Sequence, residues 1–132
     1  MRRSSMSEKI DDFRMAHVSN VYSQNAEGQL ITQANFKSEA DMAVYGEVWC
    51  TLTFTQDYET PDADSGKVSF AGEAFHSDGS KTIGFQNGTW KKTGEHVWEL
   101  EMSGKDSREG ALKTVSTISL EHLIWEGSVY RA

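Results

Sequence analysis

The chain has 132 residues, and its 20 Asp and Glu against 13 Lys and Arg give a formal net charge of −7. This acidic balance argues against nucleic acid or an anionic membrane as a partner, because phosphate binding needs a basic patch. Eleven Gly, a single Pro and the lack of any apolar run of 18 residues indicate one folded domain without a transmembrane helix.

Residues 1–15 predict an N-terminal arm or a short helix, followed by a single barrel domain over residues 16–132. Ser7 is a suitable N-cap, and Ile10 and Phe13 would share one face of a helix over residues 7–15. The first five residues begin like a basic secretory leader, but charged residues follow where the apolar segment should be. We therefore expect a cytoplasmic protein.

From about residue 16 onward, apolar and polar residues alternate with a period of two, which predicts β-strands. The strands are expected over residues 16–24, 29–37, 42–54, 65–76, 80–92, 96–103, 111–120 and 122–130. The clearest is 42–54, where Cys50 lies among the apolar positions as a buried, unreactive thiol; as the only cysteine it excludes an intrachain disulfide. In 80–92 the apolar positions switch from Ile83 and Phe85 to Trp90, which predicts a β-bulge at Asn87-Gly88.

Short turns that contain Gly or Asp separate these strands, so consecutive strands are expected to be antiparallel neighbours. An eight-stranded meander has two exposed edges unless it closes on itself. We therefore predict an all-β fold, a single eight-stranded antiparallel up-and-down barrel or half-closed barrel, with a β-sandwich as the alternative.

The negative charge is concentrated in residues 38–66, which hold seven acids and no base. Within it, Asp62-Ala63-Asp64-Ser65-Gly66 has carboxylates at alternate positions, but the spacing of a third acid and of the glycine does not fit a calcium loop. We interpret it as a solvated hairpin tip. His17, His76 and His122 could meet at one barrel mouth, but no paired histidine motif is present. We expect neither a metal nor a cofactor.

Aromatic side chains on different predicted strands, with one histidine, form the candidate ligand site. These residues are Tyr22, Phe70, His76, Phe85, Trp90, Trp98 and Trp125. They either fill the barrel or, because small neighbours such as Gly72 and Ala74 leave room, line a pocket for one flat apolar ligand. Five polar residues share the apolar side of their strands, and we expect some of them to face inward: Asn20, Thr32, His76, Thr114 and Ser116.

Three functions fit this pattern. The leading hypothesis is a non-enzymatic barrel that binds a small apolar or aromatic ligand, and the second is an isomerase or cyclase in which a Tyr, His or Glu moves a proton. The third is a solid-core module that forms a homodimer through outward aromatic residues, Tyr45, Trp49 and Phe75. A hollow apolar interior favours the first, a hollow interior with a desolvated His or carboxylate the second, and a filled interior the third.

The second half of the chain also carries a recognisable succession of short motifs. They are Ser77-Asp78-Gly79, Gly88-Thr89-Trp90, Gly94-Glu95-His96-Val97-Trp98 and Trp125-Glu126-Gly127-Ser128-Val129-Tyr130. Two Trp-bearing strands around a tight turn, followed by a closing strand with Gly before an aromatic, resemble small bacterial β-barrel proteins of lipocalin-like shape. The resemblance implies a calycin-like or allene-oxide-cyclase-like barrel, and it carries over no activity and no binding residue.

Overall fold

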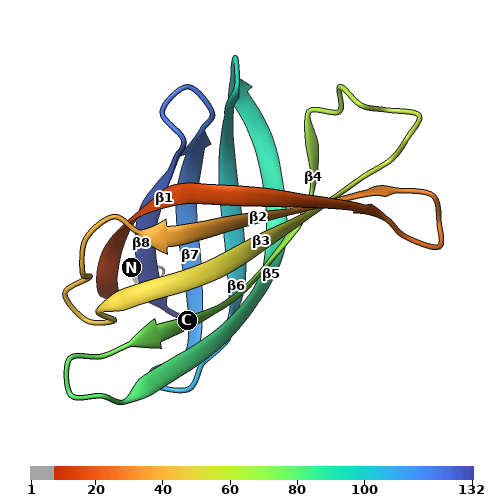
Figure 1. Cartoon of the computed structure of the whole chain (residues 1–132). Helices are drawn as coiled ribbons and strands as arrows, with labels where there is room; N and C mark the ends of the chain where they lie inside the picture. The colour runs from red at the N-terminus through yellow and green to blue at the C-terminus, as the bar shows by residue number, and fades with distance from the viewer. Residues whose placement is uncertain (1–7) are drawn as a thin grey trace, which may run out of the picture.

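A computed structural model of the protein describes residues 8–132, which form eight β-strands. The strands are β1 (Lys9–Gln24), β2 (Leu30–Ser38), β3 (Glu47–Gln56), β4 (Ser65–Phe75), β5 (Lys81–Gly94), β6 (Val97–Asp106), β7 (Gly110–Ser119) and β8 (Ile124–Arg131). Each strand pairs antiparallel with the next and β8 pairs with β1, so the sheet closes into a barrel (Figure 1). The predicted eight-stranded up-and-down barrel is confirmed, and a sandwich of two open sheets is excluded.

The predicted N-terminal helix is wrong over the residues that the structure describes, because β1 already begins at Lys9; Ser7 lies outside them. Asp11, Phe13 and Met15 alternate into the barrel interior, and β1 pairs with β8 along this stretch. Closing the barrel gives this segment a hydrogen-bonding partner, so the strand period prevails over the helical spacing of Ile10 and Phe13. Within residues 8–132 there is no helix long and apolar enough to span a membrane.

The strand expected over residues 42–54 begins later, at Glu47. Gly46 has a φ of +76°, and Met42 and Gly46 exchange two backbone hydrogen bonds of 2.8 and 3.0 Å, so the chain turns before β3 starts. The turn directs Tyr45 across one end of the barrel, where only 6% of its surface is exposed. The prediction that Tyr45 faces outward is therefore wrong, and its side chain covers this end of the barrel, which we call the closed end.

The predicted bulge at Asn87-Gly88 is also wrong, because the register between β4 and β5 runs unbroken from Lys81 to Lys91. Ile83 and Phe85 face outward with 49% and 55% of their surface exposed, whereas the alternate positions of β5 face inward. A Cβ atom added at Gly88 would collide with the carbonyl oxygen of Glu101 on β6. The glycine allows these two strands to approach closely, and it does not change the side-chain alternation.

A central plug of aromatic rings fills the middle of the barrel. Trp125 lies 4.8 Å from Phe13, 5.5 Å from Phe36 and 5.9 Å from Phe70 between ring centroids. The Trp125 Nε1–H donates a 2.8 Å hydrogen bond to Ser116 Oγ. The fully buried Met15, Leu52 and Leu100 complete the core, and a cavity lies on each side of the plug, towards the two ends of the barrel.

Candidate functional site

The open end of the barrel holds a cavity of about 450 Å³, which we call the cup. It is lined by His17, Asn20, Thr32, Ala34, Phe36, Phe54, Thr55, Gln56, Pro61, Asp62, Ala63, Trp90, Lys92, His96, Trp98, Ile118, Ser119, Leu120, Leu123 and Ile124. The β1–β2 hairpin and the β3–β4 connection project beyond the barrel at this end (Figure 1). The volume lies within the range of roughly 300–1,000 Å³ that is usual for small-molecule sites.

Aromatic side chains form the floor and one wall of the cup. Phe36, part of the central plug, closes the bottom, and the walls include Trp90 of β5, Trp98 of β6 and Phe54 of β3. The indole of Trp90 covers Gly66 on the neighbouring strand, and its Nε1–H is buried without a hydrogen-bond partner among residues 8–132. A flat apolar ligand would bury area against these rings, at roughly 25 cal/mol per Å².

The β1 side of the cup is polar. Asn20 Oδ1 lies 2.6 Å from His17 Nε2, and Asn20 Nδ2 donates a 2.9 Å hydrogen bond to Tyr22 Oη. The His17 ring stands edge-on to Phe36, with centroids 5.5 Å apart and an interplanar angle of 74°. A hydrogen-bonding edge therefore faces the aromatic wall across the cavity.

The mouth of the cup has an apolar lip and more acidic than basic side chains. Leu120 and Leu123 on the β7–β8 connection have 49% and 52% of their surface exposed. Lys92 and Asp62 bring one charge of each sign, and His96 Nδ1 lies 3.0 Å from a Glu121 carboxylate oxygen. The Glu121 carboxylate and the β3–β4 connection, which holds Asp57, Glu59, Asp62 and Asp64 and no base, give the mouth an excess of negative charge. The site therefore disfavours an anionic ligand.

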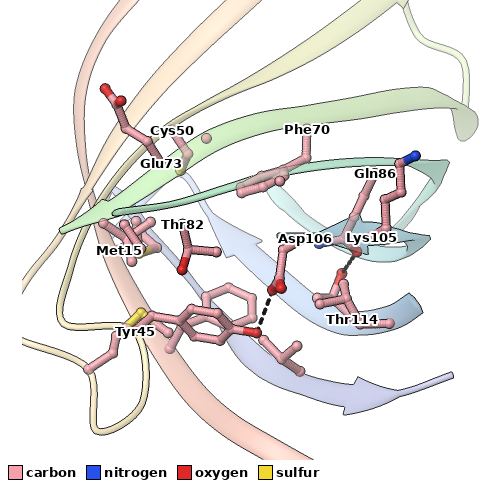
Figure 2. A pocket seen from close by; sticks show the side chains of 18 of the residues that line it. Met15, Tyr45, Cys50, Phe70, Glu73, Thr82, Gln86, Lys105, Asp106 and Thr114 are labelled. Carbon is pink, nitrogen blue, oxygen red and sulfur yellow. Dashed lines mark hydrogen bonds between the residues drawn. The ribbon is translucent and has the colours of Figure 1, made fainter. Parts of the chain in front are cut away.

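The closed end contains a much smaller cavity of about 80 Å³ (Figure 2). Tyr45 covers it and donates a 2.6 Å hydrogen bond to Asp106 Oδ2, while the Val44 amide donates a 2.8 Å hydrogen bond to Asp11 Oδ2. Burial, together with the hydrogen bond to Asp106, raises the pKa of Tyr45 far above its ordinary value of 10.0, so the phenol stays protonated and remains a donor.

Polar groups in this closed end are paired within the protein. Thr114 Oγ1 donates a 3.0 Å hydrogen bond to Gln86 Oε1, and Thr82 Oγ1 lies 2.6 Å from His76 Nε2 (the Thr114 bond is drawn in Figure 2). Burial raises the pKa of the Cys50 thiol to about 12, so the thiol that lines this cavity is protonated and a poor nucleophile. The small volume and these internal pairs make the cup the better candidate site.

The seven predicted site residues lie in different parts of the barrel. Trp90 and Trp98 line the cup together. Phe70 and Trp125 belong to the central plug and border the closed-end cavity instead. Whether any of these residues binds a ligand stays a prediction.

The other three predicted site residues lie apart from the aromatic wall. Tyr22 stands at the rim of the cup with 61% of its surface exposed, and His76 lies at the closed end beside Thr82. Phe85 faces outward, so the expectation that its ring lies in the interior is wrong. The cause is the missing bulge in β5, which leaves all odd-numbered positions of that strand outside.

Sequence reasoning found most of the inward polar residues but missed the most informative one. Thr114 and Ser116 are buried inside the barrel, and Asn20 and Thr32 line the cup. His17 also lines the cup, whereas the sequence singles it out only as one of three histidines that could meet at a barrel mouth. Phe54 was on the apolar face of its predicted strand, so alternation alone would have placed it in the cup wall.

The three histidines that could have shared a metal are separated. His17 lines the cup and His122 lies on the β7–β8 connection of the same end, whereas His76 lies at the opposite, closed end. Among residues 8–132 no group of three His, Cys, Asp or Glu side chains is arranged to hold a metal ion.

Two of the three residues of the predicted dimer face lie on the outer surface. Trp49 and Phe75 are exposed by 41% and 42%, and the outward Ile83 and Phe85 add to this apolar surface on β3, β4 and β5. A homodimer through this face stays a prediction, which sedimentation velocity would test.

Comparison with known proteins yields no match: no protein-family model, no curated protein and no solved structure is similar to this chain at a significant level. The resemblance to lipocalin-like bacterial barrels is thus supported in its barrel architecture and not as membership of a family.

Proposed function

We propose that the protein binds a small, flat, mostly apolar molecule in the cup. The observation that carries this proposal is the 450 Å³ cavity at the open end, with tryptophans on one wall and a closed floor beneath. The interior is filled at its centre and hollow at this end, which favours a binding barrel over a solid-core module. Because Tyr45 closes the other end, a ligand would enter and leave through one mouth.

Intrinsic fluorescence provides the test, because Trp90 and Trp98 lie in the cup wall. The uncharged probe N-phenyl-1-naphthylamine should bind with a saturable signal and one site per chain, and fatty acids, terpenoids, flavins or haem that bind the cup should displace it. Trp98→Leu should weaken probe binding about tenfold, since the lost aromatic contact corresponds to roughly 1–1.5 kcal/mol.

Trp49→Leu is the matched control, because Trp49 lies on the outer surface. It should leave the dissociation constant within twofold of the wild-type value. Absence of saturable binding by the probe and by every ligand class would overturn the proposal, and so would equal effects of the two substitutions.

A second candidate function, proton transfer on a bound ligand, is favoured by one observation. His17 is held at Nε2 by Asn20, in a cavity, as a general base is held by a neighbouring orienting group. Such a base would remove a proton from a carbon next to a carbonyl group and return it to the same ligand, as in an isomerase. Deuterium uptake from D₂O into a bound ketone that disappears in His17→Gln would support this function, and uptake that persists would exclude it.

A further inference from the structure

A β-bulge in β1 determines which side chains face the cup. His17 pairs with Phe36 and Ser19 with Asn35, so Val18 is an extra residue in β1. In a regular strand, His17 and Asn20 would point to opposite faces, because they are three residues apart. The bulge turns both inward, towards the side on which Phe36 and Ala34 line the cup.

The hydrogen bonds among these side chains determine where the protons lie. Asn20 Oδ1 lies 2.6 Å from His17 Nε2 while Asn20 Nδ2 donates to Tyr22 Oη, and an amide oxygen can only accept. His17 Nε2 must therefore carry a hydrogen. In a neutral imidazole the other nitrogen, Nδ1, then has a free lone pair and no hydrogen.

This lone pair has no partner within the described part of the chain: His17 Nδ1 takes part in no hydrogen bond there. The ring is half-buried at the bottom of the cup, edge-on to Phe36. A ligand that brings an O–H or N–H group to this point would satisfy the acceptor, whereas an ether or carboxylate oxygen would place a second lone pair against it.

We propose that the cup selects flat apolar ligands that carry a hydroxyl group, and that His17 Nδ1 accepts the hydrogen bond from this hydroxyl. The proposal rests on the proposed function and names the ligand class of the same site. His17 is the recognition residue, and Asn20 is a positioning residue that keeps the hydrogen on Nε2.

Two probes of nearly equal shape test this selectivity: 2-naphthol, which has a hydroxyl, and 2-methoxynaphthalene, in which a methyl group replaces the hydroxyl hydrogen. Isothermal titration calorimetry on the full chain at pH 8 should show that 2-naphthol binds about tenfold more tightly, the upper end of the usual net effect of one hydrogen bond. His17→Phe should abolish this preference, so that the two probes bind with equal affinity.

His122→Phe is the matched control, because His122 is exposed on the β7–β8 connection outside the cup lining, with its Nδ1 2.9 Å from Ser119 Oγ. It should keep the tenfold preference. Asn20→Ala should reduce the preference, since it releases the imidazole to carry its hydrogen on either nitrogen. In the unliganded protein, ¹⁵N NMR of the His17 side chain should show hydrogen on Nε2 and none on Nδ1.

The outcomes separate the two proposals. Equal binding of both probes, or a His17 ring with its hydrogen on Nδ1, would overturn the inference and leave the binding function intact. Failure of both probes and of N-phenyl-1-naphthylamine to bind would overturn the binding function and the inference with it.

Discussion

Trp125 offers the most direct test of how the barrel interior is stabilised. Only 3% of its surface is exposed, three aromatic rings surround it, and its Nε1–H donates to the equally buried Ser116. The substitution Trp125→Phe keeps an aromatic ring in the central plug but removes the hydrogen-bond donor and part of the volume.

The expected loss of stability follows from two contributions. Replacing an indole by a phenyl ring leaves a void of about 40 Å³, which at about 24 cal/mol per Å³ destabilises by about 1 kcal/mol. The Ser116 hydroxyl is left buried without its donor, which costs a further ~1–3 kcal/mol. The free energy of unfolding should therefore fall by about 2–4 kcal/mol, out of the ~5–15 kcal/mol that is usual for a single domain.

Urea denaturation followed by far-ultraviolet circular dichroism is the appropriate assay, because it does not depend on the tryptophan that is removed. With a urea m-value of about 2 kcal/mol/M, a loss of about 3 kcal/mol lowers the midpoint by about 1.5 M. Trp49→Phe, on the exposed surface, is the control and should change stability by no more than about 0.5 kcal/mol.

A double-mutant cycle with Ser116→Ala isolates the hydrogen bond. Each single substitution leaves one buried polar group unpaired, whereas the double variant removes both, so the double variant should be more stable than the sum predicts by about 1–2 kcal/mol. Additive effects within about 0.3 kcal/mol would refute the reasoning, because they would show that the indole and the hydroxyl do not depend on each other.

Three further predictions concern the closed end and the strand pairs. Tyr45 keeps its proton in the folded state, whereas in the unfolded state it ionises above about pH 10. The free energy of unfolding of the wild type should therefore exceed that of Tyr45→Phe by less at pH 10.5 than at pH 8. A difference that does not change with pH would contradict the raised pKa of Tyr45. Because burial raises the pKa of Cys50 to about 12, iodoacetamide at pH 8 should alkylate it no faster than the protein unfolds, and rapid alkylation in the native state would contradict this. Gly88→Ala should destabilise by about 3 kcal/mol, because its Cβ collides with the β6 backbone. Gly94→Ala should cost less than about 1 kcal/mol, because its Cβ would make only ordinary contact with Val97. Equal losses of stability would contradict the argument that Gly88 is needed for the close approach of β5 and β6.

The barrel could be predicted because its signals are local. Alternation through residues 42–54 and 96–103 marked two strands clearly, and short turns with Gly or Asp left only antiparallel neighbours. Closure followed from the need to remove exposed strand edges. The same alternation placed Phe54, Trp90 and Trp98 on inward faces, and these residues do line the cup.

The errors in the placement of side chains have one common origin: a bulge or a turn moves every residue beyond it to the opposite face of the strand. A bulge was expected at Gly88, where the strand is regular, and none was expected at Val18, where the structure has one. The first error placed Phe85 inside the barrel, and the second concealed that His17 and Asn20 share a face. Tyr45 was misplaced because Gly46 turns the chain before the strand begins.

The amino-acid sequence by itself determined about eight strands and their antiparallel order, since period-two alternation and turn residues act between near neighbours along the chain. It favoured closure of the sheet but left a half-closed barrel and a sandwich as alternatives, and the pairing of β1 with β8 decided between them. Only the tertiary structure decided which end is closed by Tyr45, which end stays open as the cup, and that His17 and Asn20 meet there. These features depend on register between strands and on contacts between residues far apart in sequence, such as Tyr45 with Asp106 and Phe36 with Trp125. Such contacts form only when the barrel closes, so no local pattern records them.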